Sequence, residues 1–224
     1  MDSLGLNYLF FIKQNIMQYR KGAKLLLTVI SLLGWFALIV QFYLIISNRV
    51  TSIPETIIRY FSFFTILTNL IVAICCTNLL TEGNSGMKIF FGKQTTLTAI
   101  TVYITIVGLV YNLILRFLWK PEGLQWIVDE LLHSVIPLLF IAFWLLFVAK
   151  GKLLWKSVLA WLLYPLIYLV FVLLRGIPSS FYPYPFIDVD KIGYYQTAIN
   201  SSGMLLAFLA VSILFLIANR FKKN

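Results

Sequence analysis

The chain has 224 residues, of which 61% are hydrophobic and 12% are charged, and its formal net charge is +10. A soluble domain of this length carries about a quarter charged residues, and one core could not bury so much apolar surface, so a soluble globular fold is excluded. The positive charge flanks long apolar runs instead of forming a basic stripe with exposed aromatic residues, and we therefore expect no nucleic-acid partner.

Long apolar runs follow one another along the chain, and each is long enough to cross a bilayer as a helix, which takes about 20 residues. The runs cover residues 25–46, 60–80, 97–118, 127–149, 153–174 and 197–218. They lack the alternation of apolar and polar residues that marks the strands of a membrane barrel. The sequence therefore predicts an all-α protein, a bundle of six transmembrane helices over residues 24–219.

The distribution of Lys and Arg predicts the orientation of this bundle. Twelve of the 18 Lys and Arg residues fall on the side of the two termini, and cytoplasmic loops carry the excess of these residues. We therefore expect a multi-pass protein of the cell membrane with both termini in the cytoplasm. Residues 1–23 alternate in polarity as an interfacial helix does, and residues 220–224 form a basic cytoplasmic tail.

Two connections between the predicted spans are informative. Residues 150–152 join the fourth and fifth spans so closely that we expect these helices to be antiparallel neighbours. The connection before the last span is long, and a long loop in a compact protein often serves as a lid. Its conspicuous residues are Arg175, Tyr182, Tyr184, Pro185 and Phe186. An aromatic plug that seals the outer end of the bundle is an equally good interpretation.

Ionisable residues are rare inside transmembrane helices and mark functional sites. The single histidine, His133, lies in the fourth span one turn after Asp129 and Glu130, so either carboxylate could orient its ring. Thr65, in the second span, lies at a similar depth, roughly 9 Å from the outer edge. Other polar residues in the outer halves of the spans are Thr68, Asn69, Tyr111, Asn112 and Arg116. Facing inward, they would form an outward-opening pocket, but each also suits a packing contact between helices.

A bound metal or cofactor is not expected. A zinc site takes three or four ligands, whereas the sequence offers one histidine and two adjacent cysteines, Cys75 and Cys76, inside an apolar run. No phosphate-binding loop, G-x-S-x-G or H-E-x-x-H motif occurs in the chain. Membrane lipids are the partners expected of such a chain.

Four segments carry a resemblance to a known family. They are residues 63–70 (FFTILTNL), 131–137 (LLHSVIP), 161–165 (WLLYP, continuing to Arg175 and Gly176) and 182–188 (YPYPFID). Over nearly its whole length the chain resembles small six-span membrane proteins of bacteria. These in turn resemble the androgen-induced and androgen-dependent membrane proteins of animals, which are intramembrane threonine hydrolases that cleave fatty-acid esters of hydroxy fatty acids.

The resemblance implies a threonine nucleophile in the second span and a histidine base in the fourth, His133. Thr65 and Thr68 both fit the nucleophile, and the distance from the start of the span favours Thr65. Asp129 or Glu130 would then orient His133, as the third member of a catalytic triad does. The implied oxyanion donors are Asn69, Asn112 or Tyr111. The implied substrate is a fatty-acid ester of a hydroxy fatty acid or a similar lipid ester, and the resemblance thus implies a lipid ester or fatty-acyl ligand as a partner.

Two other functions fit the same residues. The protein could bind or transport a lipid or small solute in the same pocket, with His133 and Asp129 as a recognition or proton-coupling pair. It could also be a membrane subunit without chemistry, in which Thr65 and His133 contribute to stability alone.

Overall fold

A computed structural model describes residues 21–83, 85–118, 120–149, 151 and 153–221. The described residues are 86% helical and form no strand. The helices are α2 (Lys21–Ser47), α3 (Ile53–Ser62), α4 (Phe64–Leu80), α5 (Gly86–Gly92), α6 (Gln94–Leu113), η1 (Leu115–Phe117), α7 (Gly123–Glu130), η2 (Leu131–Val135), α8 (Ile136–Phe147), α9 (Trp155–Ser179), η3 (Pro185–Ile187) and α10 (Val189–Phe221). The interfacial segment predicted over residues 1–20 and the end of the predicted tail, residues 222–224, lie outside the described residues.

The described helices are those of a multi-pass membrane protein. Five are long and apolar enough to cross a bilayer, or six when α3 and α4 are counted together as one bent span. The predicted all-α class and the number of spans agree with this, although the helices extend beyond several predicted ranges. α9 continues to Ser179, and α10 begins at Val189 and passes a non-helical Gly193 before the predicted start at residue 197.

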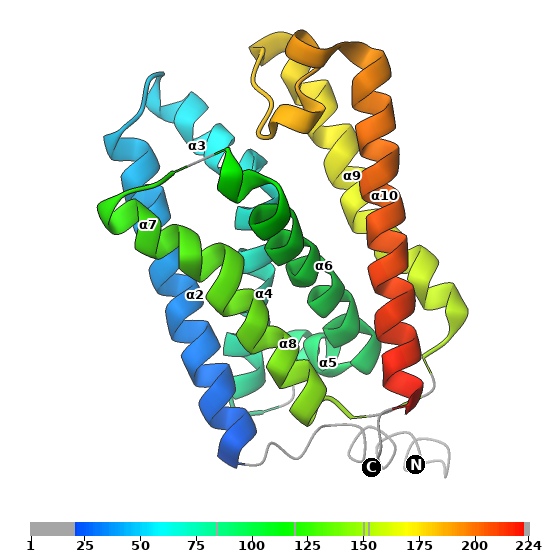
Figure 1. Ribbon diagram of the computed structural model, residues 1–224. Coiled ribbons are helices and arrows are strands. Elements are labelled where there is room, and N and C mark those ends of the chain that lie inside the picture. Colours follow the sequence, from blue (N-terminus) through cyan, green and yellow to red (C-terminus); the bar gives the residue numbers. More distant parts are fainter. Residues whose placement is uncertain (1–20, 84, 119, 150, 152, 222–224) are drawn as a thin grey trace.

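The helices form two groups that meet along α6 (Figure 1). α2 packs against α4 and α8, α6 packs against α4 and α8, and α9 packs against α10, which in turn lies against α6. Small residues bring α2 and α4 close together, because a Cβ atom placed on Gly34 would lie 3.3 Å from Cβ of Ala73. The start of α2 and the end of α10 lie at one end of the bundle, and we call the opposite end, which carries α3 and η3, the distal end.

The expectation that the fourth and fifth spans are antiparallel neighbours was wrong. Within the described residues, α9 packs against α10 and lacks an extensive contact with α8. Val148 ends the fourth span and α9 begins only at Trp155. Six intervening residues can reach about 20 Å when extended, so the chain can cross beneath α6 before it enters the next span. Short connections favour neighbouring helices, but this one is long enough to skip a neighbour.

The outer faces of the spanning helices are apolar, as contact with lipid requires. On α2, Leu32 and Ile39 are 67% and 63% exposed, and on α9 Leu159 is 69% exposed. Exposed apolar faces of this extent are not tolerated on a soluble monomer. The largest groups of buried polar side chains lie on α4 and α10.

The second span is broken at Phe63. This residue has an extended backbone (φ −81°, ψ 125°), and α3 and α4 meet there at 74°. Neither proline nor glycine lies at the break. The ring of Phe63 instead packs edge-on against the rings of Phe181 and Tyr184, with centroids 6.1 and 6.0 Å away. The aromatic loop between α9 and α10 therefore packs directly on the break.

Two tyrosine hydroxyls form hydrogen bonds with backbone groups that have no partner within the helix because of the break. Tyr168 on α9 donates to the carbonyl oxygen of Ser62 at 2.8 Å, and the N–H of Thr65 donates to the hydroxyl of Tyr184 at 3.2 Å. Backbone groups without partners are costly where water is excluded. The two tyrosines thus make a broken helix tolerable at this depth.

Replacing Tyr168 by Phe tests this role. The change removes the donor to Ser62 and is expected to lower the free energy of unfolding by about 1 kcal/mol. Thermal unfolding of the purified protein in detergent measures the effect. The matched control is Tyr195→Phe, because Tyr195 is 81% exposed. Equal melting temperatures for the two variants would contradict a capping role for Tyr168.

Candidate functional site

A large pocket opens at the distal end of the bundle and has a volume of about 1110 Å³. Its walls come from α2, α3, the start of α4, the ends of α6 and α7, η2 and the aromatic loop. The polar residues that line it are Gln41, Asn48, Arg49, Thr51, Thr56, Arg59, Tyr60, Thr65, Tyr111, Lys120, Glu122, Gln125, Asp129, His133 and Tyr184. We call this cavity the large pocket.

Thr65 and His133, which the sequence places on different spans, both line the large pocket. Thr68, the alternative nucleophile, does not line it. Its side chain is fully buried, and its hydroxyl lies 3.3 Å from that of Tyr164 on α9. Of the two threonines, it is therefore Thr65, the one that the sequence favoured, that lines the same cavity as the histidine. The side chains of Thr65 and His133 do not hydrogen-bond each other.

One face of His133 is held by Asp129 and Tyr111. Its Nδ1 atom lies 2.9 Å from the carbonyl oxygen of Asp129 and 3.4 Å from a carboxylate oxygen of the same residue. The ring of Tyr111 stacks on the imidazole at 4.1 Å, and its hydroxyl donates to the other carboxylate oxygen of Asp129 at 2.6 Å. Two acceptors at Nδ1 require the hydrogen there, which leaves Nε2 as the basic nitrogen.

Glu130, the second candidate for orienting His133, has a different partner. Arg116 Nη2 lies 2.7 and 2.8 Å from its two carboxylate oxygens, and Arg116 Nε donates to Oδ1 of Asn112 at 3.0 Å. Arg116 also lies over the ring of Tyr111 at 5.1 Å. Of the two carboxylates, it is therefore Asp129 that contacts the histidine ring, and Glu130 ties η1 to α7.

Two asparagines hold the backbone around His133 in place. The segment Leu131–Val135 is a π-helix, a feature frequent at functional sites. It is followed by Pro137, which has no N–H to offer to the carbonyl of Leu132 five residues earlier or of His133 four residues earlier. Asn69 on α4 donates to the Leu132 carbonyl at 3.1 Å, and Asn112 on α6 donates to the His133 carbonyl at 3.3 Å.

Asn69 also links this segment to the candidate nucleophile. Its Nδ2 atom donates to the carbonyl oxygen of Thr65 at 2.9 Å as well as to that of Leu132. One buried amide group thus joins the residue before His133 to Thr65 itself. Because both N–H bonds of Asn69 are in use, its predicted role as an oxyanion donor does not fit this geometry.

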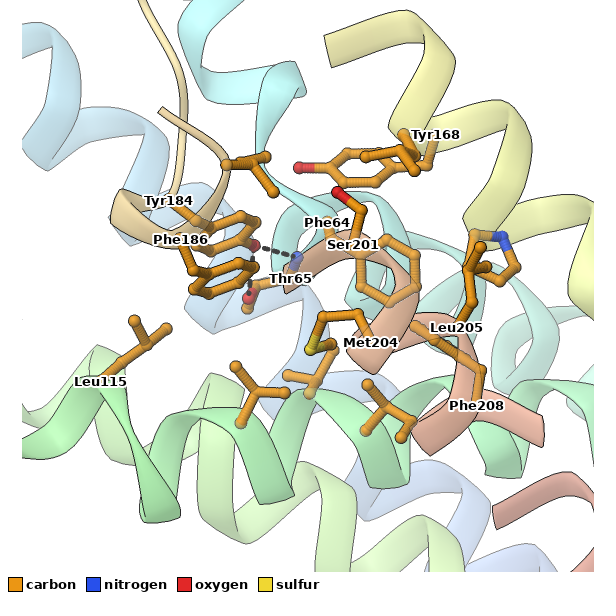
Figure 2. Close-up of a pocket in the computed structure, with 16 residues that line it drawn as sticks. Phe64, Thr65, Leu115, Tyr168, Tyr184, Phe186, Ser201, Met204, Leu205 and Phe208 are labelled. Atoms are coloured by element: carbon orange, nitrogen blue, oxygen red, sulfur yellow. Dashed lines mark hydrogen bonds between the residues drawn. The ribbon is translucent and has the colours of Figure 1, made fainter. Parts of the chain in front are cut away.

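Thr65 lies in the first turn of α4, next to the helix break (Figure 2). The first hydrogen bond within this helix runs from the N–H of Leu67 to the carbonyl of Phe63 at 3.1 Å, so the N–H of Thr65 has no partner within the helix. It donates to the hydroxyl of Tyr184, which also lies 3.4 Å from Oγ1 of Thr65. This contact across 119 positions of sequence had no signal in the sequence beyond the aromatic character of the loop.

A second, small pocket of about 70 Å³ lies on the other side of Thr65, between α6, α9 and α10. Its lining is nearly all apolar and includes Val110, Phe186 and Met204, as Figure 2 shows for the last two. Three residues line both pockets: Thr65, Leu115 and Tyr184. The hydroxyl of Thr65 therefore lies where a mainly apolar cavity meets a cavity with a polar rim.

The aromatic loop is fastened to α3 by charge. Glu55 accepts from Arg59 Nε at 2.8 Å and from Arg175 Nη2 at 2.5 Å. Both guanidinium groups lie over the ring of Phe181, at 4.5 and 4.8 Å from its centroid. Arg175 also donates to the carbonyl of Phe181 at 3.3 Å. The sequence analysis singled out Arg175 but missed Glu55 and Phe181, which give it its partners.

The other residues that the sequence analysis singled out in this region belong to the aromatic loop, which packs over the helix break. Tyr182 packs so closely over Gly176 that a Cβ atom there would overlap its ring. Pro185 lines the large pocket, and Phe186 stacks on Tyr184 with ring centroids 5.2 Å apart. The loop thus closes over the break and over Thr65 in this structure.

The arrangement offers no evident metal site. The described residues contain no group of three or more His, Cys, Asp or Glu side chains placed to hold a metal ion. Asp129, Glu130 and His133 are close in sequence, but their side chains turn to different partners, since Glu130 pairs with Arg116.

Comparison of the chain with protein-family models, with curated proteins and with solved structures found no match. The family resemblance read from the motifs therefore stays an expectation, and the site must be judged on its own geometry.

Asn69→Leu tests whether the asparagine link positions the site. The change removes two hydrogen bonds while the helical bond to the Thr65 carbonyl remains, so we expect a loss of about 1 kcal/mol in the free energy of unfolding. We expect a larger effect on the reactivity of Thr65, measured with a fluorophosphonate probe, because α4 and η2 lose their register. Asn78→Leu is the matched control, since the side chain of Asn78 donates to the carbonyl oxygen of Ile74 within the same helix, α4. Unchanged reactivity in Asn69→Leu would refute the positioning role.

Proposed function

We propose that the chain is an intramembrane hydrolase of lipid esters, with Thr65 as nucleophile and His133 as general base. The observation that carries the proposal is the large pocket, which is lined both by Thr65 and by a histidine whose Nδ1 is held by Asp129. Nucleophile, base and orienting carboxylate are the three groups that acyl transfer needs. Here they come from α4, η2 and α7, which Asn69 and the continuous α7–η2 segment hold together.

In the first step, Oγ1 of Thr65 attacks the ester carbonyl carbon and its proton passes to Nε2 of His133. The new C–O bond forms as the electron pair of the C=O bond moves onto the carbonyl oxygen. His133, now positively charged, lies against the carboxylate of Asp129, which stabilises that charge. Since Thr65 and His133 do not touch in the free protein, binding of the substrate has to bring them into contact, as is common for catalytic hydrogen bonds.

In the second step the tetrahedral intermediate collapses. The bond to the leaving oxygen breaks, His133 returns the proton to that oxygen, and the alcohol departs, leaving an acyl-threonine. Water then attacks the acyl group with His133 again as base, which releases a fatty acid and restores Thr65. No cofactor is needed for either half of the reaction.

The two cavities that meet at Thr65 support a lipid ester as substrate. The small pocket offers an apolar wall to the acyl chain beside the carbonyl, and the large pocket offers space and a polar rim to the alcohol part. A fatty-acid ester of a hydroxy fatty acid, the substrate class that the motif resemblance implies, has both parts. In the cell membrane, with both termini in the cytoplasm, the large pocket would open on the outer side.

Fluorophosphonate labelling of the purified protein in detergent tests the proposal. We expect no labelling of Thr65→Ala or Thr65→Val, since neither has a hydroxyl, and at least a roughly hundredfold slower reaction of His133→Ala. Thr68→Ala is the matched control, because Thr68 lies outside both pockets, and it should label within about twofold of the wild type.

Labelling that survives in Thr65→Val, or that is lost in Thr68→Ala alone, would contradict the assignment of the nucleophile. Absence of labelling and of ester hydrolysis in the wild type would favour a lipid-binding or transport protein, which direct binding of a fatty acid would then reveal. A membrane subunit without chemistry predicts neither reaction nor binding.

Asp129→Asn and Glu130→Gln separate the two carboxylates. Asp129 contacts His133 and Glu130 pairs with Arg116. Asp129→Asn should slow labelling about tenfold, equivalent to about 1.4 kcal/mol of lost stabilisation of the charged imidazole. The effect stays moderate because the backbone carbonyl of Asp129 still holds Nδ1. Glu130→Gln should have little effect on the labelling rate, and the reverse order of the two variants would show that the wrong carboxylate has been assigned.

A further inference from the structure

We propose that the hydroxyl of Tyr184 is a catalytic hydrogen-bond donor that stabilises the oxyanion formed when Thr65 attacks an ester. The inference rests on the proposed function and adds to it the group that lowers the barrier of the acyl-transfer step. It assigns a chemical role to the aromatic loop, which otherwise only covers the helix break.

The position of the Tyr184 hydroxyl supports this role. Its oxygen lies 3.2 Å from the backbone N of Thr65 and 3.4 Å from Oγ1 of the same residue (Figure 2). An oxyanion bonded to the carbon that Oγ1 attacks forms within reach of the same two groups. The hydroxyl therefore lies beside the place where negative charge develops.

The donors that the sequence suggested for this role are already engaged. Asn69 donates to two carbonyl groups, and Asn112 donates to the carbonyls of Gly108 and His133. The hydrogen of the Tyr111 hydroxyl goes to Asp129. Tyr184 differs from these, because its oxygen accepts from the N–H of Thr65 and lies 3.4 Å from Oγ1, so its own hydrogen can turn to an oxyanion that forms beside Oγ1.

The surroundings of Tyr184 keep this donor rigid and protonated. Its ring stacks on Phe186 with planes 4° apart and meets Phe63 edge-on. Tyr184 belongs to the loop between the spanning helices, and burial raises the pKa of its hydroxyl. A donor that is fixed in advance and does not ionise at neutral pH needs no reorganisation when the oxyanion forms.

The proton count of the reaction is unchanged by this donor. When Oγ1 of Thr65 bonds to the carbonyl carbon, its proton goes to His133 and the carbonyl electron pair becomes the oxyanion. Tyr184 donates a hydrogen bond to that oxygen and keeps its proton. As the alcohol leaves, the oxyanion again becomes a carbonyl and the hydrogen bond weakens.

The test is hydrolysis of 4-nitrophenyl decanoate by the purified full-length chain in detergent. Tyr184→Phe should lower kcat about a hundredfold with little change in KM, because the lost bond exists chiefly in the transition state. The matched control is Tyr164→Phe, which removes the equivalent hydroxyl beside Thr68 one turn deeper and lines neither pocket. It should leave kcat and KM unchanged.

A purely structural role for Tyr184, as the acceptor that caps the N–H of Thr65, makes a different prediction. Replacing Tyr184 by 3-fluorotyrosine keeps the hydroxyl but lowers its pKa. If the hydroxyl must donate, the variant is active at neutral pH, where its hydroxyl still carries the hydrogen. Its kcat then falls at a lower alkaline pH than the kcat of the wild type, because the fluorinated hydroxyl loses its proton at lower pH. A phenolate is a better acceptor than a phenol, so a mere cap would not lose function there. This comparison stands even if Tyr184→Phe does not fold.

Failure of the inference and failure of the proposed function give different results. If Thr65→Ala and His133→Ala lose hydrolysis while folded Tyr184→Phe keeps the kcat of the wild type or exceeds it, Tyr184 is no donor and the hydrolase stands. If kcat of the 3-fluorotyrosine variant falls at the same alkaline pH as kcat of the wild type, the donor role is likewise overturned, and the hydrolase stands. If Thr65→Ala hydrolyses the ester as fast as the wild type, the hydrolase and the donor fall together.

Discussion

The need to satisfy backbone groups inside an apolar environment shapes this protein more than any single contact. The second span breaks at Phe63, and the freed carbonyl of Ser62 and N–H of Thr65 are taken by Tyr168 and Tyr184. In the fourth span the N–H that Pro137 lacks leaves carbonyls that are taken by Asn69 and Asn112. These four polar side chains thereby join helices or a helix and the aromatic loop, instead of being isolated costs in lipid.

These same contacts bring the candidate site together. Asn69 holds Thr65 and the segment of His133 in one register, and the aromatic loop reaches the break because Glu55 binds both Arg59 and Arg175. Close approach of α6 is possible because Gly108 has no side chain, and a Cβ atom there would lie 3.3 Å from the His133 carbonyl oxygen. Structural and proposed catalytic roles are thus carried by adjacent atoms of the same residues.

Much of the fold could be predicted from the sequence, because hydrophobic runs of sufficient length have few alternatives in a membrane. Counting residues along the spans predicted a similar depth for Thr65 and His133, and both residues line the large pocket. The break at Phe63 and the π-helix around His133 could not be predicted, since tertiary contacts decide both and no proline or glycine marks the break. The burial of Thr68 away from the large pocket and the contact of Tyr184 with Thr65 depend on helix rotation and loop path, which the sequence pattern of a largely apolar span does not encode. The neighbour of α9 was mispredicted for the same reason.

The central claim is that Thr65 carries the acyl group during the reaction. The most direct measurement is to mix the unmodified protein with a lipid ester, quench with acid, digest, and locate the acyl mass by mass spectrometry. The account predicts the added mass on the peptide that contains Thr65, and its loss when the mixture is left to turn over. Acylation of another residue, or ester cleavage with no acylated peptide even under rapid quench, would contradict it.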